Sequence, residues 1–121
     1  LWNRDVAFVF VRPTRYTYAF IERTGLLTLS FFGEEWRDAL TVCGTMSGRD
    51  VDKAGLTGLK PAEPRPGFIG FEQADLTFAC RVIHKQDIDP AGFVDGSLEG
   101  HYDGDYHRVY VAEIVAALAR A

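Results

Sequence analysis

Short runs of β-branched and aromatic residues, each closed by glycine, proline or charged residues, most constrain the fold of this chain. Val6–Val11 contains no polar residue and is closed by Arg12 and Pro13, which is typical of a strand buried on both faces. Leu26–Phe32 and Tyr106–Val115 are further runs of this kind. Because the segments between the runs are short, the pattern predicts a mainly β fold, a barrel with short helices between strands.

Apolar residues recur at helical spacing in two of the connecting segments. After the first run they predict a helix that Thr14 caps and Gly25 ends. A second helix is predicted from Glu34, whose charge suits a first turn, as far as Gly44. A third, shorter helix is predicted to begin at Ser47 and to end at Gly55.

The second half of the chain is predicted to contain loops and long strands. The segment 58–67 holds three prolines and predicts a surface loop. Alternating residues from Leu76 to His84 predict a strand long enough to need a bend or bulge. A turn-rich insertion from Asp89 to Asp105 then leads to the last strand.

Two of the predicted helix starts are rich in hydroxyl groups and cations, which suits an anion. A helix start presents unpaired backbone N–H groups and a partial positive charge. The chain has 13 Lys and Arg against 17 Asp and Glu, yet four of these cations lie in the segments 12–17 and 47–53. The alternative is that these are ordinary helix caps and surface charges. The candidate anion-binding residues are Arg12, Thr14, Arg15, Thr17, Ser47, Arg49 and Lys53.

Composition narrows the class of protein. The chain has 121 residues, enough for one domain that folds alone or as a dimer. Its formal net charge of −4 argues against a nucleic-acid-binding protein, which would need a basic face. Because the sequence contains no membrane-spanning run and no signal-type start, we expect a cytoplasmic protein without a membrane partner.

No established catalytic or metal-binding motif is present in the sequence. His101, Asp103, Asp105 and His107 would share one face of an extended segment, but Gly104 marks a turn there, so no metal site is predicted. His107 begins the last strand and could meet a substrate, although a half-exposed histidine without a role fits its position as well. Any chemistry would therefore come from a bound organic cofactor.

Several of these segments, in this order, resemble the flavin reductase-like, FMN-binding split-barrel family, and most closely its flavoredoxin-type branch. The resemblance covers almost the whole chain. The segments that carry it are Trp2-Asn3, Val9–Thr17, Thr28–Phe32, Cys43–Asp50 and Asp105-Tyr106-His107.

This resemblance implies a single FMN-binding domain over residues 1–121, a six-stranded split β-barrel that forms a homodimer and holds FMN near the dimer interface. The family normally has a further N-terminal strand, which we expect to be missing here. Ser30 would lie near the flavin, and His107 would meet nicotinamide or the flavin edge. The cofactor-binding residues that the resemblance implies are Arg12, Arg15, Tyr16, Thr17, Ser30, Ser47, Gly48, Arg49, Lys53 and His107.

Two functions are compatible with this set of residues. The first is a flavin oxidoreductase that transfers hydride or electrons between NAD(P)H, bound FMN and an acceptor, which can be a redox protein. The second is a non-enzymatic electron carrier or sensor that holds FMN without turnover. Both would use the same anion site, so the sequence leaves the choice open.

Overall fold

The computed structural model of this chain describes residues 1–46 and 52–120. They form six strands and three α-helices, with short 3-10 helices at 34–36, 90–92 and 96–101. The strands are β1 (Val6–Val11), β2 (Leu26–Phe31), β3 (Pro61–Arg65), β4 (Phe68–Phe71), β5 (Leu76–Asp87) and β6 (Arg108–Ala119), and the helices are α1 (Tyr16–Thr24), α2 (Arg37–Thr45) and α3 (Lys53–Thr57).

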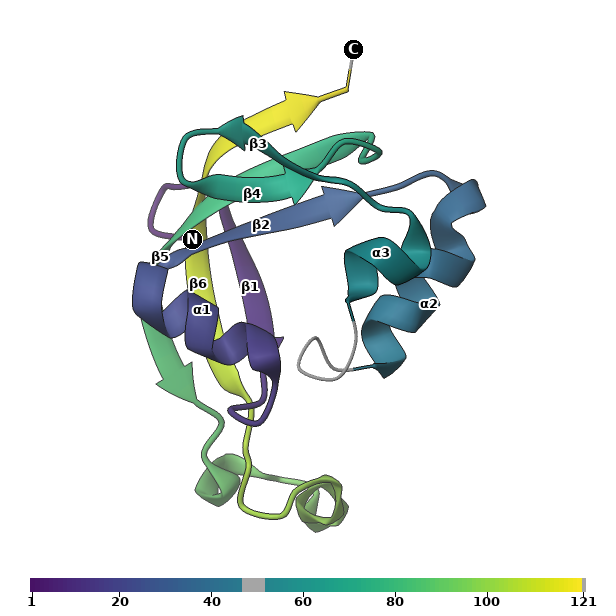
Figure 1. The fold of residues 1–121 in the computed structure, drawn as a ribbon. Coiled ribbons are helices and arrows are strands. Elements are labelled where there is room, and N and C mark those ends of the chain that lie inside the picture. The colour runs from purple at the N-terminus through teal and green to yellow at the C-terminus, as the bar shows by residue number, and fades with distance from the viewer. Residues whose placement is uncertain (47–51, 121) are drawn as a thin grey trace.

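Four strands form one antiparallel sheet in the order β1-β6-β5-β2, which curls into half a barrel (Figure 1). β1 pairs with β6, beginning with Val6 opposite Glu113. β3 and β4 form a separate hairpin that packs on β2, where the Thr28 hydroxyl donates to the Ile69 carbonyl at 2.6 Å. This arrangement confirms the predicted mainly β fold with short helices between strands.

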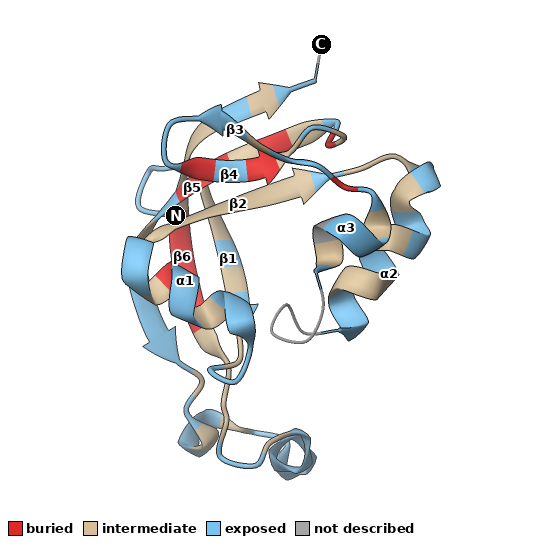
Figure 2. Ribbon diagram, in the orientation of Figure 1, coloured by how far each residue is buried: buried red, intermediate tan, exposed pale blue. Residues whose placement is uncertain are grey.

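The core follows the two central strands of the sheet (Figure 2). Ala79 and Cys80 on β5 and Ala112 on β6 have no exposed surface, and Tyr110 on β6 is 1% exposed. Both strands have neighbours on either side, so their backbone groups are paired and their side chains are shielded. β5 and β6 are therefore the rigid base on which the other elements pack.

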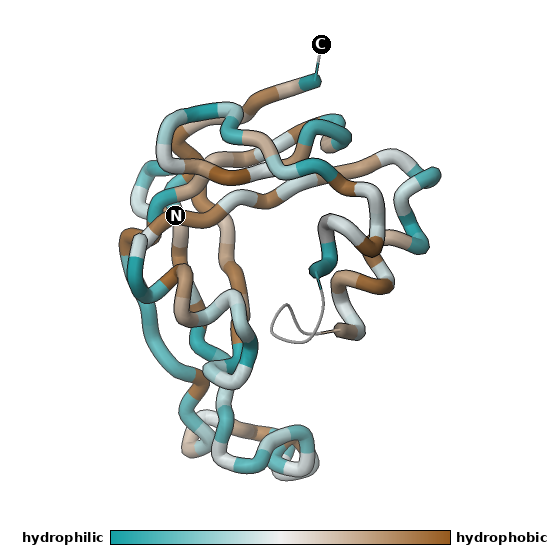
Figure 3. The backbone as a smooth tube through the Cα atoms, in the orientation of Figure 1, coloured by the Kyte–Doolittle hydropathy of each residue, from teal (hydrophilic) through white to brown (hydrophobic). Residues whose placement is uncertain are grey.

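β1 is hydrophobic (Figure 3), but it is not buried on both faces as predicted. Phe8 and Phe10 are 54% and 57% exposed. The physical reason is topological: β1 is an edge strand, and only β6 pairs with it among the described residues. An apolar run predicts that its side chains are buried, but it does not say which surface covers them.

The predicted irregularity of β5 is confirmed. Its pairing with β6 shifts register between Ala79 and Cys80 and again between Val82 and His84. Extra residues at such points bend a strand and increase its twist. β5 and β6 are each 12 residues long, and the register shifts between them accompany the curl of the sheet.

The predicted loop over 58–67 is wrong in its central part, because 61–65 is strand β3. Pro61 lies opposite Phe71, and the register shifts between Ala62 and Arg65, which accommodates a second proline in between. Proline is tolerated here because β3 is the edge of a two-stranded ladder. Gly67, with φ of 86°, makes the tight turn into β4.

Three predicted helix boundaries also need correction. α1 ends at Gly25 as predicted, with φ of 68°, but its N-cap is Arg15 and not Thr14. α2 includes Gly44 and ends where Met46 becomes extended. Gly55 likewise lies inside α3. A glycine ends a helix only where the chain adopts a left-handed conformation, and neither of these two glycines has a positive φ.

The last strand begins at Arg108 and not at Tyr106, and it continues to Ala119. No helix in the described ranges 1–46 and 52–120 is long and apolar enough to cross a membrane.

Candidate functional site

A cavity of about 710 Å³ lies where β1 leads into α1, facing α2 and α3. Its walls come from chain segments that are far apart in the sequence, and Phe10, Val11 and Met46 are apolar parts of them. Six of the predicted cofactor-binding residues line this one cavity: Arg12, Arg15, Tyr16, Thr17, Lys53 and His107.

A tight turn positions the start of α1 at this cavity. The Arg15 backbone N–H donates to the Arg12 carbonyl at 3.0 Å, which closes a turn around Pro13. Arg15 is the N-cap of α1, and Tyr16 and Thr17 form its first turn. First-turn N–H groups of a helix have no carbonyl partner within the helix, so they can bind an anion. α1 is thus directed with its positive end at the cavity.

Lys53 reaches the same cavity from the opposite wall. It is the first residue of α3, and its ammonium group donates to the Cys43 carbonyl in α2 at 2.6 Å. This bond ties α3 to α2 and fixes the position of the charge. Thr17 and Lys53 therefore face one shared cavity within a single copy of the chain, although they come from separate helices.

Arg12 lines the cavity, but its guanidinium group is also bonded to the insertion between β5 and β6. It donates to the His101 carbonyl at 2.8 Å and to the Asp105 carboxylate at 3.3 Å. The Asp103 backbone N–H, together with Arg12, holds the pKa of Asp105 below its usual range. Arg12 thus links the end of β1 to the insertion.

His107 lies in the cavity wall beside an aromatic cluster that the sequence analysis did not single out. The Tyr102 hydroxyl is 2.7 Å from Nδ1 of His107. Phe93, Tyr102 and Tyr106 pack together through ring contacts of 4.9–6.2 Å. The signal in the sequence was that Phe93 and Tyr102 lie inside the turn-rich insertion and Tyr106 directly follows it, although loops of this kind seldom contain packed rings.

Four predicted cofactor-binding residues remain, of which the structure describes only Ser30. Ser30 lies on β2 opposite Thr77 and is not among the residues that line the cavity. Ser47, Gly48 and Arg49 lie outside the described residues. In the described part of the chain, no three His, Cys, Asp or Glu side chains converge in a way that could hold a metal ion.

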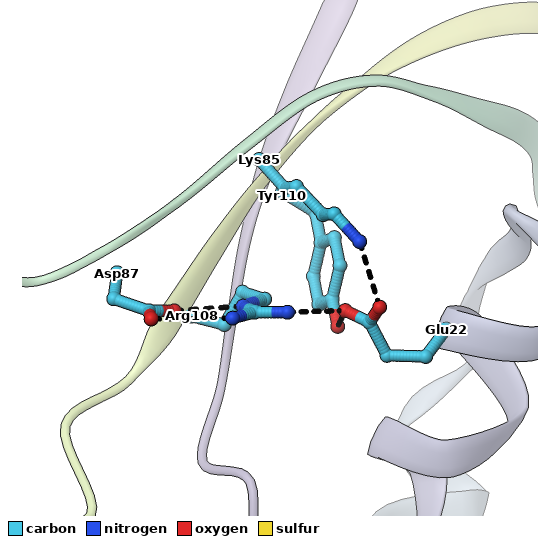
Figure 4. A network of polar contacts seen from close by, with 5 residues as sticks. All are labelled: Glu22, Lys85, Asp87, Arg108 and Tyr110. Carbon is cyan, nitrogen blue, oxygen red and sulfur yellow. Dashed lines mark hydrogen bonds and ion pairs between the residues drawn. The ribbon is translucent and has the colours of Figure 1, made fainter.

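A charged network holds α1 against the sheet (Figure 4). The Glu22 carboxylate accepts hydrogen bonds from Lys85 at 2.8 Å, from Arg108 at 2.8 Å and from the Tyr110 hydroxyl at 2.7 Å. Arg108 also pairs with Asp87 at 2.7 Å. These bonds join the last turn of α1 to β5 and β6.

The network shifts the acidity of its members. Hydrogen bonds from Lys85, Tyr110 and Arg108 lower the pKa of Glu22 from 4.5 to about 2. Burial and the bond to Glu22 raise the pKa of the Tyr110 hydroxyl above its ordinary value. Glu22 is therefore charged and Tyr110 neutral at neutral pH. Spacing in the sequence could not reveal this network, because Glu22 and Arg108 meet only in the folded chain.

The chemistry of the cavity suits a phosphate monoester. A guanidinium group (Arg15), a hydroxyl (Thr17), an ammonium group (Lys53) and the amides of a helix start all donate to anionic oxygens. Apolar side chains next to them could contact the ring of a larger ligand. The residues present thus fit a phosphorylated aromatic cofactor.

Comparisons with known proteins agree with this geometry. The family model described as "Flavin reductase like domain" matches residues 5–121. No curated protein matches the sequence significantly.

Solved structures show the same fold. An FMN-binding protein from Thermus thermophilus has a TM-score of 0.76 at 19% identity, over 99% of this chain and 58% of that one. Flavoredoxin from Methanosarcina acetivorans has a TM-score of 0.73 at 23% identity, over 98% and 54%. Nitrilotriacetate monooxygenase component B from Bacillus cereus has a TM-score of 0.75 at 14% identity, over 99% and 57%. This chain therefore spans little more than half the length of each of these proteins, and the likenesses confirm the expected split-barrel architecture.

Proposed function

Because this chain belongs to the flavin reductase-like domain family, we propose that it binds FMN in the α1–α3 cavity and transfers hydride or electrons between NAD(P)H, the flavin and an acceptor. Family membership supports a flavin-related redox role. One observation carries the more specific proposal: Thr17 and Lys53, from separate helices, line one cavity at a helix start. The choice of FMN follows from the donors there, which suit a terminal phosphate.

In this proposal the residues of the chain bind and orient the cofactor. Arg15, Thr17 and Lys53 bind the phosphate, and the amides of the first turn of α1 complete its hydrogen bonds. The bond from Lys53 to the Cys43 carbonyl keeps the ammonium group in position before the ligand arrives. The bound isoalloxazine supplies the redox chemistry, while the protein sets its position and surroundings.

A homodimer is part of the proposal. Phe8 and Phe10 are more than half exposed on the edge strand β1, and Phe10 also lines the cavity. Burial of two such rings against a second copy would remove a large apolar area from water. The dimer interface would then lie beside the flavin site.

Fluorescence titration with FMN tests the cofactor assignment. Lys53→Met removes a charge-assisted bond, worth about 1.5–3 kcal/mol, so we expect the Kd for FMN to rise roughly tenfold to a hundredfold. Lys60→Met is the matched control, because Lys60 is exposed and does not line the cavity, and it should leave the Kd unchanged. An unchanged Kd in Lys53→Met would refute the phosphate assignment. A parallel titration with FAD measures the preference between the two flavins.

Anaerobic mixing with nicotinamides separates an oxidoreductase from a carrier or sensor. Bleaching of the bound flavin by NADH or NADPH supports turnover, and the faster of the two identifies the donor. Bound flavin that is reduced by dithionite but not by either nicotinamide would overturn the enzymatic proposal in favour of the non-enzymatic one.

A further inference from the structure

A hydrogen bond with Tyr102 restrains the side chain of His107. The Tyr102 hydroxyl lies 2.7 Å from Nδ1 of His107, and the two rings meet edge to face at 5.4 Å. Among the described residues, Nδ1 is the only nitrogen of this ring with a hydrogen-bond partner. Because His107 also lines the cavity, Nε2 is the nitrogen that remains for a ligand.

The backbone of His107 is fixed as well. Its carbonyl accepts a hydrogen bond from the Ile88 N–H at 2.9 Å, which closes the base of the insertion between β5 and β6. The next residue, Arg108, begins β6 and pairs with Asp87 at the end of β5. The main freedom left to His107 is rotation of its side chain, and the bond to Tyr102 restrains that rotation.

Tyr102 is in turn held by several neighbours. Its ring stacks on Phe93 at 6.1 Å and contacts Tyr106 at 4.9 Å. The Arg12 guanidinium lies over the same ring, 4.9 Å from its centre, and donates to the neighbouring His101 carbonyl. A phenol packed in this way has few alternative rotamers, so its hydroxyl has a defined position.

The chemistry of the two groups gives this hydrogen bond a direction. A phenol is a better donor than acceptor, whereas the unprotonated nitrogen of a neutral imidazole is a good acceptor. The bond that one ring nitrogen makes determines which nitrogen carries the proton. If Tyr102 donates to Nδ1, the proton of the neutral ring must lie on Nε2.

We propose that Tyr102 is a positioning residue that holds neutral His107 in the tautomer protonated at Nε2, so that the ring presents an N–H donor to the cavity. The consequence for catalysis rests on the proposed function: with FMN bound, this N–H would be available to donate to a carbonyl oxygen of the flavin edge or of the nicotinamide. Tyr102 itself contacts neither ligand and acts only through His107.

Nitrogen-15 NMR of the histidine rings tests the tautomer directly in the protein without flavin. The chain has 3 histidines, so His84→Gln and His101→Gln assign the signals. At alkaline pH, where histidine is neutral, we expect His107 to have a protonated Nε2 and an unprotonated Nδ1. A proton on Nδ1, or rapid exchange between the two tautomers, in the unmodified protein would overturn the proposal without any Tyr102 variant.

Two variants, each lacking one tyrosine hydroxyl, then test whether Tyr102 acts on His107 through its hydrogen bond or only through the packing of its ring. Tyr102→Phe keeps the ring but removes the bond, and we expect a mixture of His107 tautomers. Tyr106→Phe is the matched control, because its hydroxyl donates to Glu99 in the same cluster, and it should leave the His107 spectrum unchanged. An unchanged spectrum in a folded Tyr102→Phe protein, verified by near-ultraviolet circular dichroism, would contradict the assignment.

Kinetics connect the tautomer to the proposed function. In flavin-loaded protein, we expect Tyr102→Phe to slow flavin reduction by NADH about tenfold, with the Kd for FMN within about twofold of the original. A normal reduction rate in Tyr102→Phe would remove the catalytic consequence of the proposal. Failure of the unmodified protein to bind flavin would refute the proposed function but leave the tautomer result standing, so the two failures can be told apart.

Discussion

Replacing Glu22 with glutamine should weaken the attachment of α1 to the sheet and change how stability depends on pH. The carboxylate accepts bonds from Lys85, Arg108 and Tyr110. A glutamine side chain has nearly the same shape, but it is neutral and its amide nitrogen cannot accept a bond. At least one donor would therefore lose its partner, Lys85 would lose its ion pair, and Arg108 would keep only its pair with Asp87.

The magnitude follows from the acidity of Glu22. A fall of its pKa from 4.5 to about 2 would correspond to about 3 kcal/mol of stabilisation at neutral pH, at 1.36 kcal/mol per pKa step. The Glu22 side chain is 24% exposed and that of Lys85 is 52% exposed, so solvent screens part of this interaction. We therefore expect Glu22→Gln to lower the free energy of unfolding by about 1–2 kcal/mol.

The pH dependence has a definite sign. Because the folded-state pKa of Glu22 is lower than the unfolded one, its contribution is complete above about pH 4.5 and is lost as the pH falls towards about 2. Glutamine does not titrate. The difference in stability between the original protein and Glu22→Gln should thus shrink across this window.

Urea unfolding followed by tryptophan fluorescence measures this difference at neutral pH and at points within the acidic window. Glu34→Gln is the matched control, since Glu34 pairs with Arg37 on the surface with both side chains more than 70% exposed. It should lower the free energy of unfolding much less than Glu22→Gln does, because solvent screens the exposed pair. A Glu22→Gln difference that stays constant with pH, or that is no larger than the Glu34→Gln difference, would refute the reasoning.

Two further predictions use a thiol reagent and the exposed edge strand. Cys80 has no exposed surface and burial raises its pKa, whereas Cys43 lines the cavity, so Ellman's reagent should modify Cys43 first. Bound FMN should slow the modification of Cys43, and equal rates with and without FMN would contradict a shared site. In size exclusion with light scattering, Phe8→Lys should shift the protein from dimer towards monomer, while Ile69→Lys, at a similarly exposed residue on β4, should not. If Phe8→Lys dimerises as strongly as the original protein, the interface lies elsewhere.

Much of the fold was predictable from the order of the residues. Strands β1, β2 and β5, the stop of α1 at Gly25 and the irregularity of β5 all follow from local patterns. Two of the wrong helix boundaries share a cause. Gly44 and Gly55 have no positive φ and lie within helices, so their type alone did not decide the conformation.

The sequence predicted the anion-binding chemistry of the candidate site, but not the full set of residues that form it. Hydroxyls and cations at two predicted helix starts indicated an anion, and residues from both segments, Thr17 and Lys53, do line one cavity. Ser30, which only the family resemblance supported, lies elsewhere, opposite Thr77. Tyr102 had no support from the sequence, yet it contacts His107.

The sequence alone determined where β1, β2 and β5 form and where positive charge and hydroxyls gather, because both depend on residues that are close neighbours in the chain. Only the tertiary structure decided that β1 is an edge strand, that Glu22 meets Arg108, and that Tyr102 lies behind His107. These contacts depend on sheet order and on how the insertion between β5 and β6 folds back. They arise from packing over long sequence separations, which local patterns do not encode.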